Sequence, residues 1–282
     1  MRWDRNYQSN NVDDRRSSSG GGMMGGGLPL GGLLALGSRF GWKGILIALL
    51  VVGAIYGGMC NGGLSMCSGG GDDGRPSATE TSSPKAGQSD EMARFVGFVL
   101  DDVQKTWREQ IPNYQTTRLV LFRGAIGSAC GNATAAVGPF YCPLDRKVYI
   151  DLAFYDELKR RFGAPGDFAQ AYVIAHEVGH HVQNLRGLLD NEGRDNQHQV
   201  QIELQADCLA GAWGRDAQRR NLLEVGDIDE ALNAASQIGD DTIQRKTQGR
   251  VQPETWTHGS AAQRSAAFKR GFENGAESCG LR

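Results

Sequence analysis

Two histidines stand four residues apart, with a glutamate directly after the first, in an H-E-x-x-H pattern formed by His176, Glu177 and His180. This spacing predicts an α-helix, because residues four apart in a helix lie on one face. On that face both imidazoles can reach one zinc ion at about 2 Å. The apolar residues 172–175 before the motif indicate a buried helix, which we expect over residues 168–185. Glu177 then lies beside the metal, where it can act as general base on a zinc-activated water.

A third metal ligand has to come from elsewhere, because catalytic zinc takes three protein ligands and keeps a fourth position for water. Glu203 and Asp207 also stand four apart, in a stretch with helical periodicity over residues 198–220. One carboxylate can bind zinc while the other accepts the N–H of a ligating histidine and fixes its tautomer. The spacing leaves open which does which. We predict that His258 faces the oxyanion; the alternative is a residue that only precedes a helix over residues 260–272.

Three further polar residues receive lesser roles. His181 lies about 100° around the helix from His180 and is expected to pack or to support a ligand. His198 sits in a polar run and is expected to be solvated. Arg264 is expected to support either His258 or a metal ligand.

The charge and the cysteines narrow the class of protein further. The 282 residues carry a net charge of -2 and no basic stripe interleaved with aromatic residues, so we expect neither a nucleic-acid partner nor a nucleotide cofactor. No cysteine pair has C-x-x-C spacing, which favours disulfides in an oxidising compartment. We predict the pairs Cys130–Cys142 and Cys208–Cys279, while any pairing of Cys60 and Cys67 stays open.

An uncharged apolar run over residues 45–59 predicts a membrane anchor over residues 41–60, close to the roughly 20 residues that a bilayer needs. Arginines and lysines precede the run and acidic residues follow it, so the positive-inside rule predicts a cytoplasmic N-terminus. A cleaved signal peptide is the alternative. It is disfavoured because the run starts far into the chain and no A-x-A-like cleavage site follows.

The remaining segments follow from composition and periodicity. Glycine-rich residues 1–40 are predicted to form a flexible cytoplasmic tail, and residues 61–89 a linker. The folded domain is expected over residues 90–282 and begins with a helix that ends before Pro112. Alternation predicts strands over 117–123 and 147–152, and helical patterns cover 154–162, 168–185, 198–220, 227–248 and 260–272. The predicted fold is therefore α+β, mostly helical with a small β-sheet, preceded by a single transmembrane helix.

Three segments carry a resemblance to a known family: HEVGHHVQ, ELQADCLAG and THGSAAQRSAAFKRGF. In this order they resemble the bacterial neutral zinc metallopeptidase family of membrane-anchored proteins, within the thermolysin-like glutamate zincins, over residues 90–282 and more loosely at the anchor. The resemblance implies a zincin-like domain with His176, His180 and Glu203 as Zn²⁺ ligands. It also implies Glu177 as general base and Asp207 as the partner that orients a ligating histidine.

These observations predict a zinc-dependent metallopeptidase that is anchored by one pass in the bacterial inner membrane and hydrolyses protein or peptide substrates in the periplasm. The alternative is a catalytically silent, membrane-anchored binding or scaffold protein that keeps zinc for stability. Glu177 disfavours this alternative, because structural zinc needs no general base. A zinc hydrolase acting on a non-peptide amide is a third interpretation.

Overall fold

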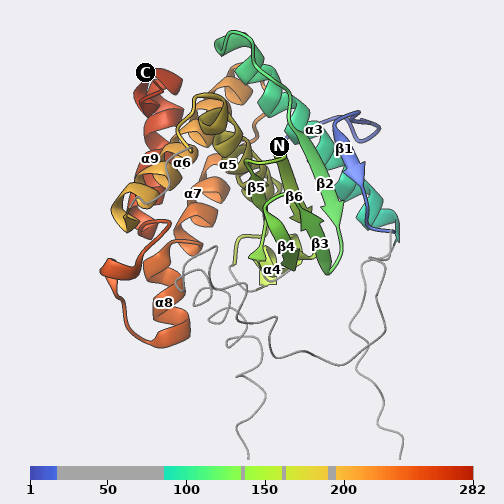
Figure 1. Ribbon diagram of the computed structural model, residues 1–282. Coiled ribbons are helices and arrows are strands. Elements are labelled where there is room, and N and C mark those ends of the chain that lie inside the picture. The colour runs from blue at the N-terminus through green and yellow to red at the C-terminus, as the bar shows by residue number, and fades with distance from the viewer. Residues whose placement is uncertain (18–85, 135–136, 161–162, 190–194, 282) are drawn as a thin grey trace, which may run out of the picture. The chain divides into compact units, whose positions relative to one another are not determined.

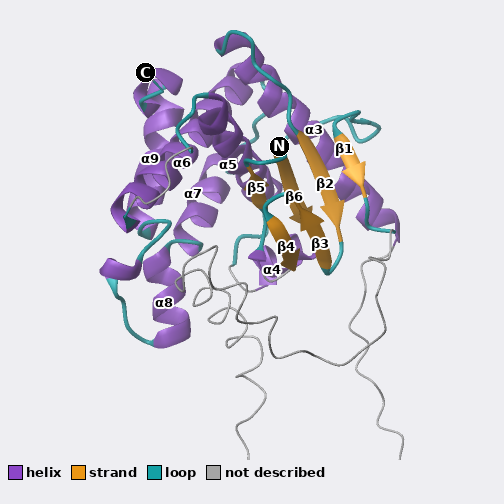
Figure 2. Ribbon diagram, viewed as in Figure 1, coloured by secondary structure: helices purple, strands orange, loops and turns teal. Residues whose placement is uncertain are grey.

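The computed structural model describes residues 1–17, 86–134, 137–160, 163–189 and 195–281. Within these residues the protein is a mixed α+β fold in which helix predominates and the sheets are small, as predicted (Figures 1 and 2). Residues 1–17 and 91–281 belong to one compact unit. A second unit is described only over residues 86–90, at the start of the first long helix.

The main sheet has four strands in the order β1-β2-β6-β5. Their bounds are Val12–Asp14 for β1, Arg118–Phe122 for β2, Phe140–Cys142 for β5 and Lys147–Asp151 for β6. The strands β1, β2 and β6 run parallel, and β5 pairs antiparallel with β6. A separate hairpin consists of β3 (Ala125–Ser128) and β4 (Gly131–Thr134). The two predicted strands correspond to β2 and β6, the most buried pair of the sheet.

Seven α-helices occur among the described residues: α3 (Ala86–Gln110), α4 (Ala153–Arg160), α5 (Asp167–Leu185), α6 (Asn196–Arg219), α7 (Asp227–Gln237), α8 (Asp240–Gln248) and α9 (Ala261–Asn274). Two short 3₁₀ turns, η3 (Pro253–Thr255) and η4 (Ala276–Cys279), flank α9. The prediction of a single helix over residues 227–248 is wrong, because the helix is interrupted at Gly239, between α7 and α8. A Cβ there would overlap the backbone of Ala261, so glycine allows the start of α9 to lie against this break.

Glycines also set how closely the three site-forming helices approach. Figure 1 shows α5 between the sheet and the pair α6 and α9. A Cβ on Gly179 of α5 would lie 3.1 Å from the backbone of Ala206 in α6, and a Cβ on Gly271 of α9 would overlap the carbonyl of Cys208. Small residues at these crossings bring the backbones together. The polar face of α5 therefore lies directly against α6.

Two disulfides cross-link this arrangement. Cys130 and Cys142 are joined at 2.01 Å, linking the β3–β4 hairpin to β5. Cys208 and Cys279 are joined at 2.03 Å, linking the middle of α6 to the C-terminal turn η4. These are the two pairs that the sequence analysis put forward.

The first 17 residues differ from the prediction of a flexible tail, since they are folded into the compact unit. Val12–Asp14 forms strand β1 beside β2, and Met1 is buried with 5% exposure. Trp3 packs edge-on against Phe95 of α3 at a centroid distance of 5.3 Å. Apolar residues in this segment are separated by charged ones without helical or strand periodicity, so no sequence pattern marks them.

The predicted transmembrane helix finds no support in the described part of the chain. None of the helices there combines the length and apolar character that a membrane span requires. The predicted anchor over residues 41–60, and the predicted linker up to residue 85, fall outside the described residues.

Candidate metal centre

Three side chains from α5 and α6 converge on one point. His176 Nε2 lies 3.1 Å from Glu203 Oε2 and 3.2 Å from His180 Nε2. His180 Nε2 lies 3.5 Å from Glu203 Oε1. A tetrahedral zinc ion with bonds of 2.0–2.1 Å holds its ligand atoms about 3.3 Å apart. The spacing of these three side chains therefore fits a zinc ion without rearrangement.

The outer nitrogen of each histidine faces an acceptor. His176 Nδ1 donates to Asp207 Oδ1 at 2.8 Å, and His180 Nδ1 donates to Gln183 Oε1 at 2.8 Å. The Gln183 amide is oriented because its Nε2 donates to the Ile202 carbonyl at 2.7 Å. With the proton on Nδ1, a neutral imidazole presents the lone pair of Nε2 to the centre. Two such lone pairs 3.2 Å apart repel each other unless a metal ion or a proton lies between them.

Asp207 is itself held by a buried network. Arg264 of α9, 3% exposed, donates from Nε to Asp207 Oδ2 at 2.9 Å and from Nη2 to Oδ1 at 3.0 Å. The Tyr172 hydroxyl donates to the same Oδ1 at 2.5 Å. Burial by itself raises the pKa of the Asp207 carboxyl, but Arg264 and His176 bring that pKa far below its usual range. Arg264 therefore holds the carboxylate of Asp207 that orients His176.

The electrostatics of the metal-free site favour positive charge at its centre. Burial lowers the pKa of His176, but the charges of Asp207 and Glu203 outweigh it and raise that pKa to about 10. Burial raises the pKa of Glu203, while His180 and His176 bring it well below its ordinary value. The carboxylates thus hold protons on the histidines when no metal is bound. A divalent cation satisfies the same demand more fully.

Glu177 lies beside the ligands without joining them. It is 7% exposed on α5, and its charge contributes to raising the pKa of His180. The cluster of converging ligand atoms, all within 4.8 Å of one another, contains only His176, His180 and Glu203 among the described residues. Glu177 is therefore placed to act near a bound metal without being a ligand.

His258 stands at the rim, in the turn before α9, with 44% of its side chain exposed. Asp240 organises this turn: its Oδ2 accepts the backbone N–H groups of Thr257, His258 and Gly259 at 2.7, 2.7 and 3.0 Å. Asp240 Oδ1 also lies 3.3 Å from His258 Nδ1. Burial lowers the pKa of His258, but Asp240 and Glu203 give a net rise in that pKa.

The other two histidines lie apart from this centre. His181 is fully buried; its Nε2 donates to the Gln115 carbonyl at 2.6 Å, and its Nδ1 accepts from the Tyr141 hydroxyl at 3.0 Å. Both its nitrogens are thus used in joining α5 to β5 and the loop before β2. His198 lies half-buried in the first turn of α6, where its backbone N–H is capped by Asp195.

Gln183 and Asp240 belong to this site although neither was predicted from the sequence. Gln183 lies one turn after His180, so its spacing of three residues was a usable signal. Asp240 has no such signal, because it reaches a turn 18 residues further along the chain. Only the folded chain shows that this carboxylate orients His258.

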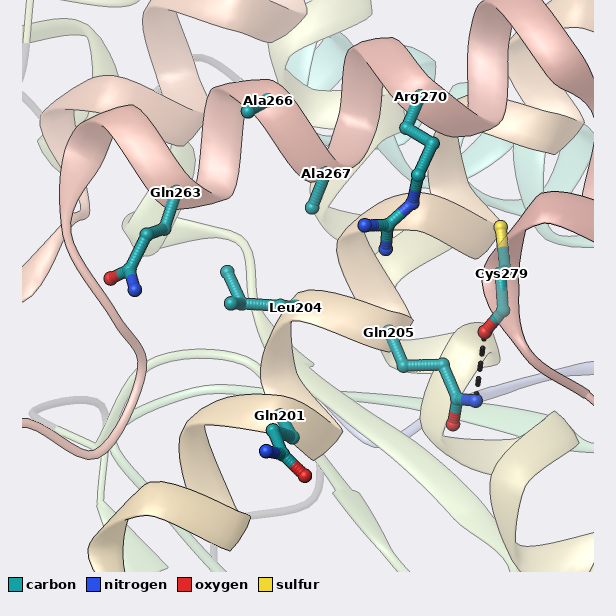
Figure 3. Close-up of a pocket in the computed structure, with 8 residues that line it drawn as sticks. All are labelled: Gln201, Leu204, Gln205, Gln263, Ala266, Ala267, Arg270 and Cys279. Carbon is teal, nitrogen blue, oxygen red and sulfur yellow. Dashed lines mark hydrogen bonds between the residues drawn. The ribbon is translucent and has the colours of Figure 1, made fainter.

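A hollow of about 440 Å³ between α6 and α9 is separate from the metal centre (Figure 3). Its lining includes Gln201 and Gln205 of α6, which each lie about 200° around the helix from Glu203. Arg270 of α9 reaches into it, and Gln205 donates to the Cys279 carbonyl at 2.9 Å. This hollow therefore opens away from the ligand atoms.

The fold is mixed α+β, and two histidines and one glutamate converge between α5 and α6 in a cluster that could hold a metal ion. The chain matches, over residues 1–280, the family described as "Putative neutral zinc metallopeptidase", and it belongs to that family.

Two relatives illustrate the extent of the similarity. "Uncharacterized protein YpfJ" of Escherichia coli strain K12 is 44% identical over 290 residues, which cover 98% of this chain and 96% of the relative. "Uncharacterized protein Rv2575" of Mycobacterium tuberculosis is 44% identical over 190 residues, which cover 62% of this chain and 65% of the relative. No solved structure gives a significant match.

Proposed function

We propose that this protein is a zinc-dependent metallopeptidase of the thermolysin-like glutamate zincin type, with His176, His180 and Glu203 as the metal ligands. The observation that carries the proposal is the pair of Nε2 atoms 3.2 Å apart, each turned inward by an acceptor on Nδ1, with a glutamate oxygen 3.1 Å away. Two imidazoles and one carboxylate form the ligand set of peptidase zinc sites. The family of the chain agrees with zinc as the metal.

Zn²⁺ held by these ligands would polarise a substrate carbonyl and increase the acidity of water. Glu177 accepts the proton of the attacking water and passes it to the leaving amine, which fits its position beside the ligands. His258 donates a hydrogen bond to the oxyanion from the rim. Asp240 keeps the His258 ring in place, and Asp207 keeps His176 in the tautomer that presents Nε2.

A catalytically silent zinc protein accounts less well for the same residues. Structural zinc sites are closed by four protein ligands, whereas the described residues supply three at this cluster. The buried Glu177 beside an incomplete ligand set suits hydrolysis, and the half-exposed His258 leaves that side of the site accessible.

We propose that the site lies in an oxidising compartment, the bacterial periplasm, where it would act on proteins or peptides. The two disulfides support this placement, because such bonds persist mainly outside the cytosol.

The proposed activity is tested by identifying new protein N-termini in the cell envelope. Cells lacking the protein are complemented with the wild type, with Glu177→Gln, or with Glu157→Gln, a matched control at an exposed position of α4. We expect the same set of new termini for the wild type and Glu157→Gln, and loss of that set for Glu177→Gln at unchanged zinc content. Equal termini for all three would reject the peptidase.

A further inference from the structure

The N-terminal segment, residues 1–17, completes the main sheet. Strand β1 pairs with β2 in parallel, with Val12 opposite Leu119 and Asp14 opposite Leu121. Hydrogen bonds extend beyond the strand itself, since the Leu119 N–H donates to the Asn11 carbonyl at 2.9 Å and the Arg15 N–H to the Leu121 carbonyl at 2.8 Å. Without the segment, β2 would be an edge strand with unpaired backbone groups. Figure 1 shows β1 beside β2 at that edge.

Side chains of α3 are shaped to receive this segment. A Cβ on Gly97 would approach the Ser9 Cβ to 2.8 Å, so only glycine leaves room there. Asp101 accepts hydrogen bonds from the Tyr7 hydroxyl at 2.9 Å and from Asn11 Nδ2 at 2.6 Å. These contacts lie on a helix at least 80 residues further along the chain. Residues 1–17 therefore pack as an integral part of the folded domain.

The segment also reaches the helix that carries the metal ligands. The Met1 amino group lies 2.6 Å from Asp167, the first residue of α5, and 3.4 Å from Asp227 of α7. Both the sheet edge and the start of α5 are therefore covered by residues 1–17.

The arginines of this segment have partners within the fold. Arg5 pairs with Glu91, Arg2 lies 3.8 Å from Glu224, and Arg15 and Arg16 each pair with the aspartate two residues before them. The positive-inside rule counts positive charges that stay in the cytoplasm beside a membrane span. Arginines that form ion pairs within a folded domain lie on the same side of a membrane as that domain. Their sign therefore does not place the N-terminus in the cytoplasm.

We infer that residues 1–17 and the domain of residues 91–281 lie in the same compartment, on the oxidising side where the two disulfides form. A strand cannot hydrogen-bond to a sheet across a hydrocarbon layer of about 30 Å. The two described parts of the chain then lie on the same side of any membrane. This holds equally if β1 docks on a second copy of the chain. This inference contradicts the predicted topology, in which a single membrane pass leaves the N-terminus in the cytoplasm.

Cysteine accessibility in the full-length protein tests this inference. In a background with Cys60→Ser and Cys67→Ser, single cysteines are introduced at Gln8 or Ser17 of the exposed N-terminal surface, and at Val225, which is fully exposed on the domain. Intact spheroplasts are treated with a membrane-impermeant maleimide, and lysed spheroplasts give the maximum labelling. Non-reducing electrophoresis reports whether each variant retains both disulfides, and two N-terminal sites guard against misfolding of one variant.

We expect Gln8→Cys, Ser17→Cys and Val225→Cys to be labelled to similar extents in intact spheroplasts. Labelling of Val225→Cys alone, with both N-terminal cysteines protected until lysis, would restore the single pass and overturn the inference. Protection of all three until lysis would overturn the placement on the oxidising side.

Discussion

Replacing Arg264 by methionine should destabilise the metal-free protein strongly, although the methionine side chain fills most of the space that the arginine side chain occupies. The guanidinium donates two hydrogen bonds to the Asp207 carboxylate, at 2.9 and 3.0 Å, and both side chains are almost fully buried. Removing one partner of a buried ion pair leaves an uncompensated charge and costs about 3–5 kcal/mol. We therefore expect Arg264→Met to lower the free energy of unfolding by that amount. Arg264→Lys should recover part of it, because lysine restores the charge without the two-pronged geometry.

The assay is urea unfolding in the presence of a chelator, followed by fluorescence of the buried Trp107 and Trp213. A double-mutant cycle with Asp207→Asn isolates the coupling between the two side chains, because the second substitution removes the charge that loses its guanidinium partner in the first. We expect the double variant to be more stable than the sum of the two single losses predicts. Strict additivity, or a loss below about 1 kcal/mol for Arg264→Met, would show that Arg264 does not stabilise the protein through Asp207.

Three further outcomes are expected at the metal centre. Glu203→Ala should lose bound zinc while His198→Ala keeps it, as measured by elemental analysis after dialysis, because only Glu203 converges with the two histidines. Zinc binding near pH 8 should release protons, because the pKa of His176 is about 10 in the metal-free protein and the metal binds the neutral ring. The apparent affinity for zinc should therefore fall as the pH falls. Calorimetry in buffers of different ionisation enthalpy measures the proton release. His258→Ala should lower kcat by about 10²–10³-fold at unchanged zinc content, the usual effect of losing an oxyanion donor; loss of zinc would instead make His258 a ligand.

The two helices of the metal site could be predicted from the sequence because the spacing of their polar residues is a local pattern. His176 and His180 are one turn apart, as are Glu203 and Asp207, and an α-helix converts this spacing directly into a shared face. The spacing did not decide between the two carboxylates. The structure separates them: Glu203 reaches the Nε2 atoms, whereas Asp207 accepts from Nδ1 of His176.

Other features depend on contacts between distant parts of the chain. Strand β1 has three residues and is stable only because β2, more than 100 positions later, offers its edge. The break between α7 and α8 at Gly239 follows from the close approach of Ala261. Asp240 has no motif around it, and its role arises from the return of the chain before α9. Local periodicity carries none of this information.

His176, His180 and Glu203 are expected to bind one zinc ion and to leave its fourth coordination position open. Anomalous diffraction at the zinc absorption edge from crystals of the zinc-loaded protein tests it directly. We expect a single strong peak at about 2.0–2.2 Å from the Nε2 atom of each histidine and from a Glu203 carboxylate oxygen, with no fourth protein ligand. A peak at another cluster, or one coordinated by His258 or by Asp207 in place of Glu203, would contradict it.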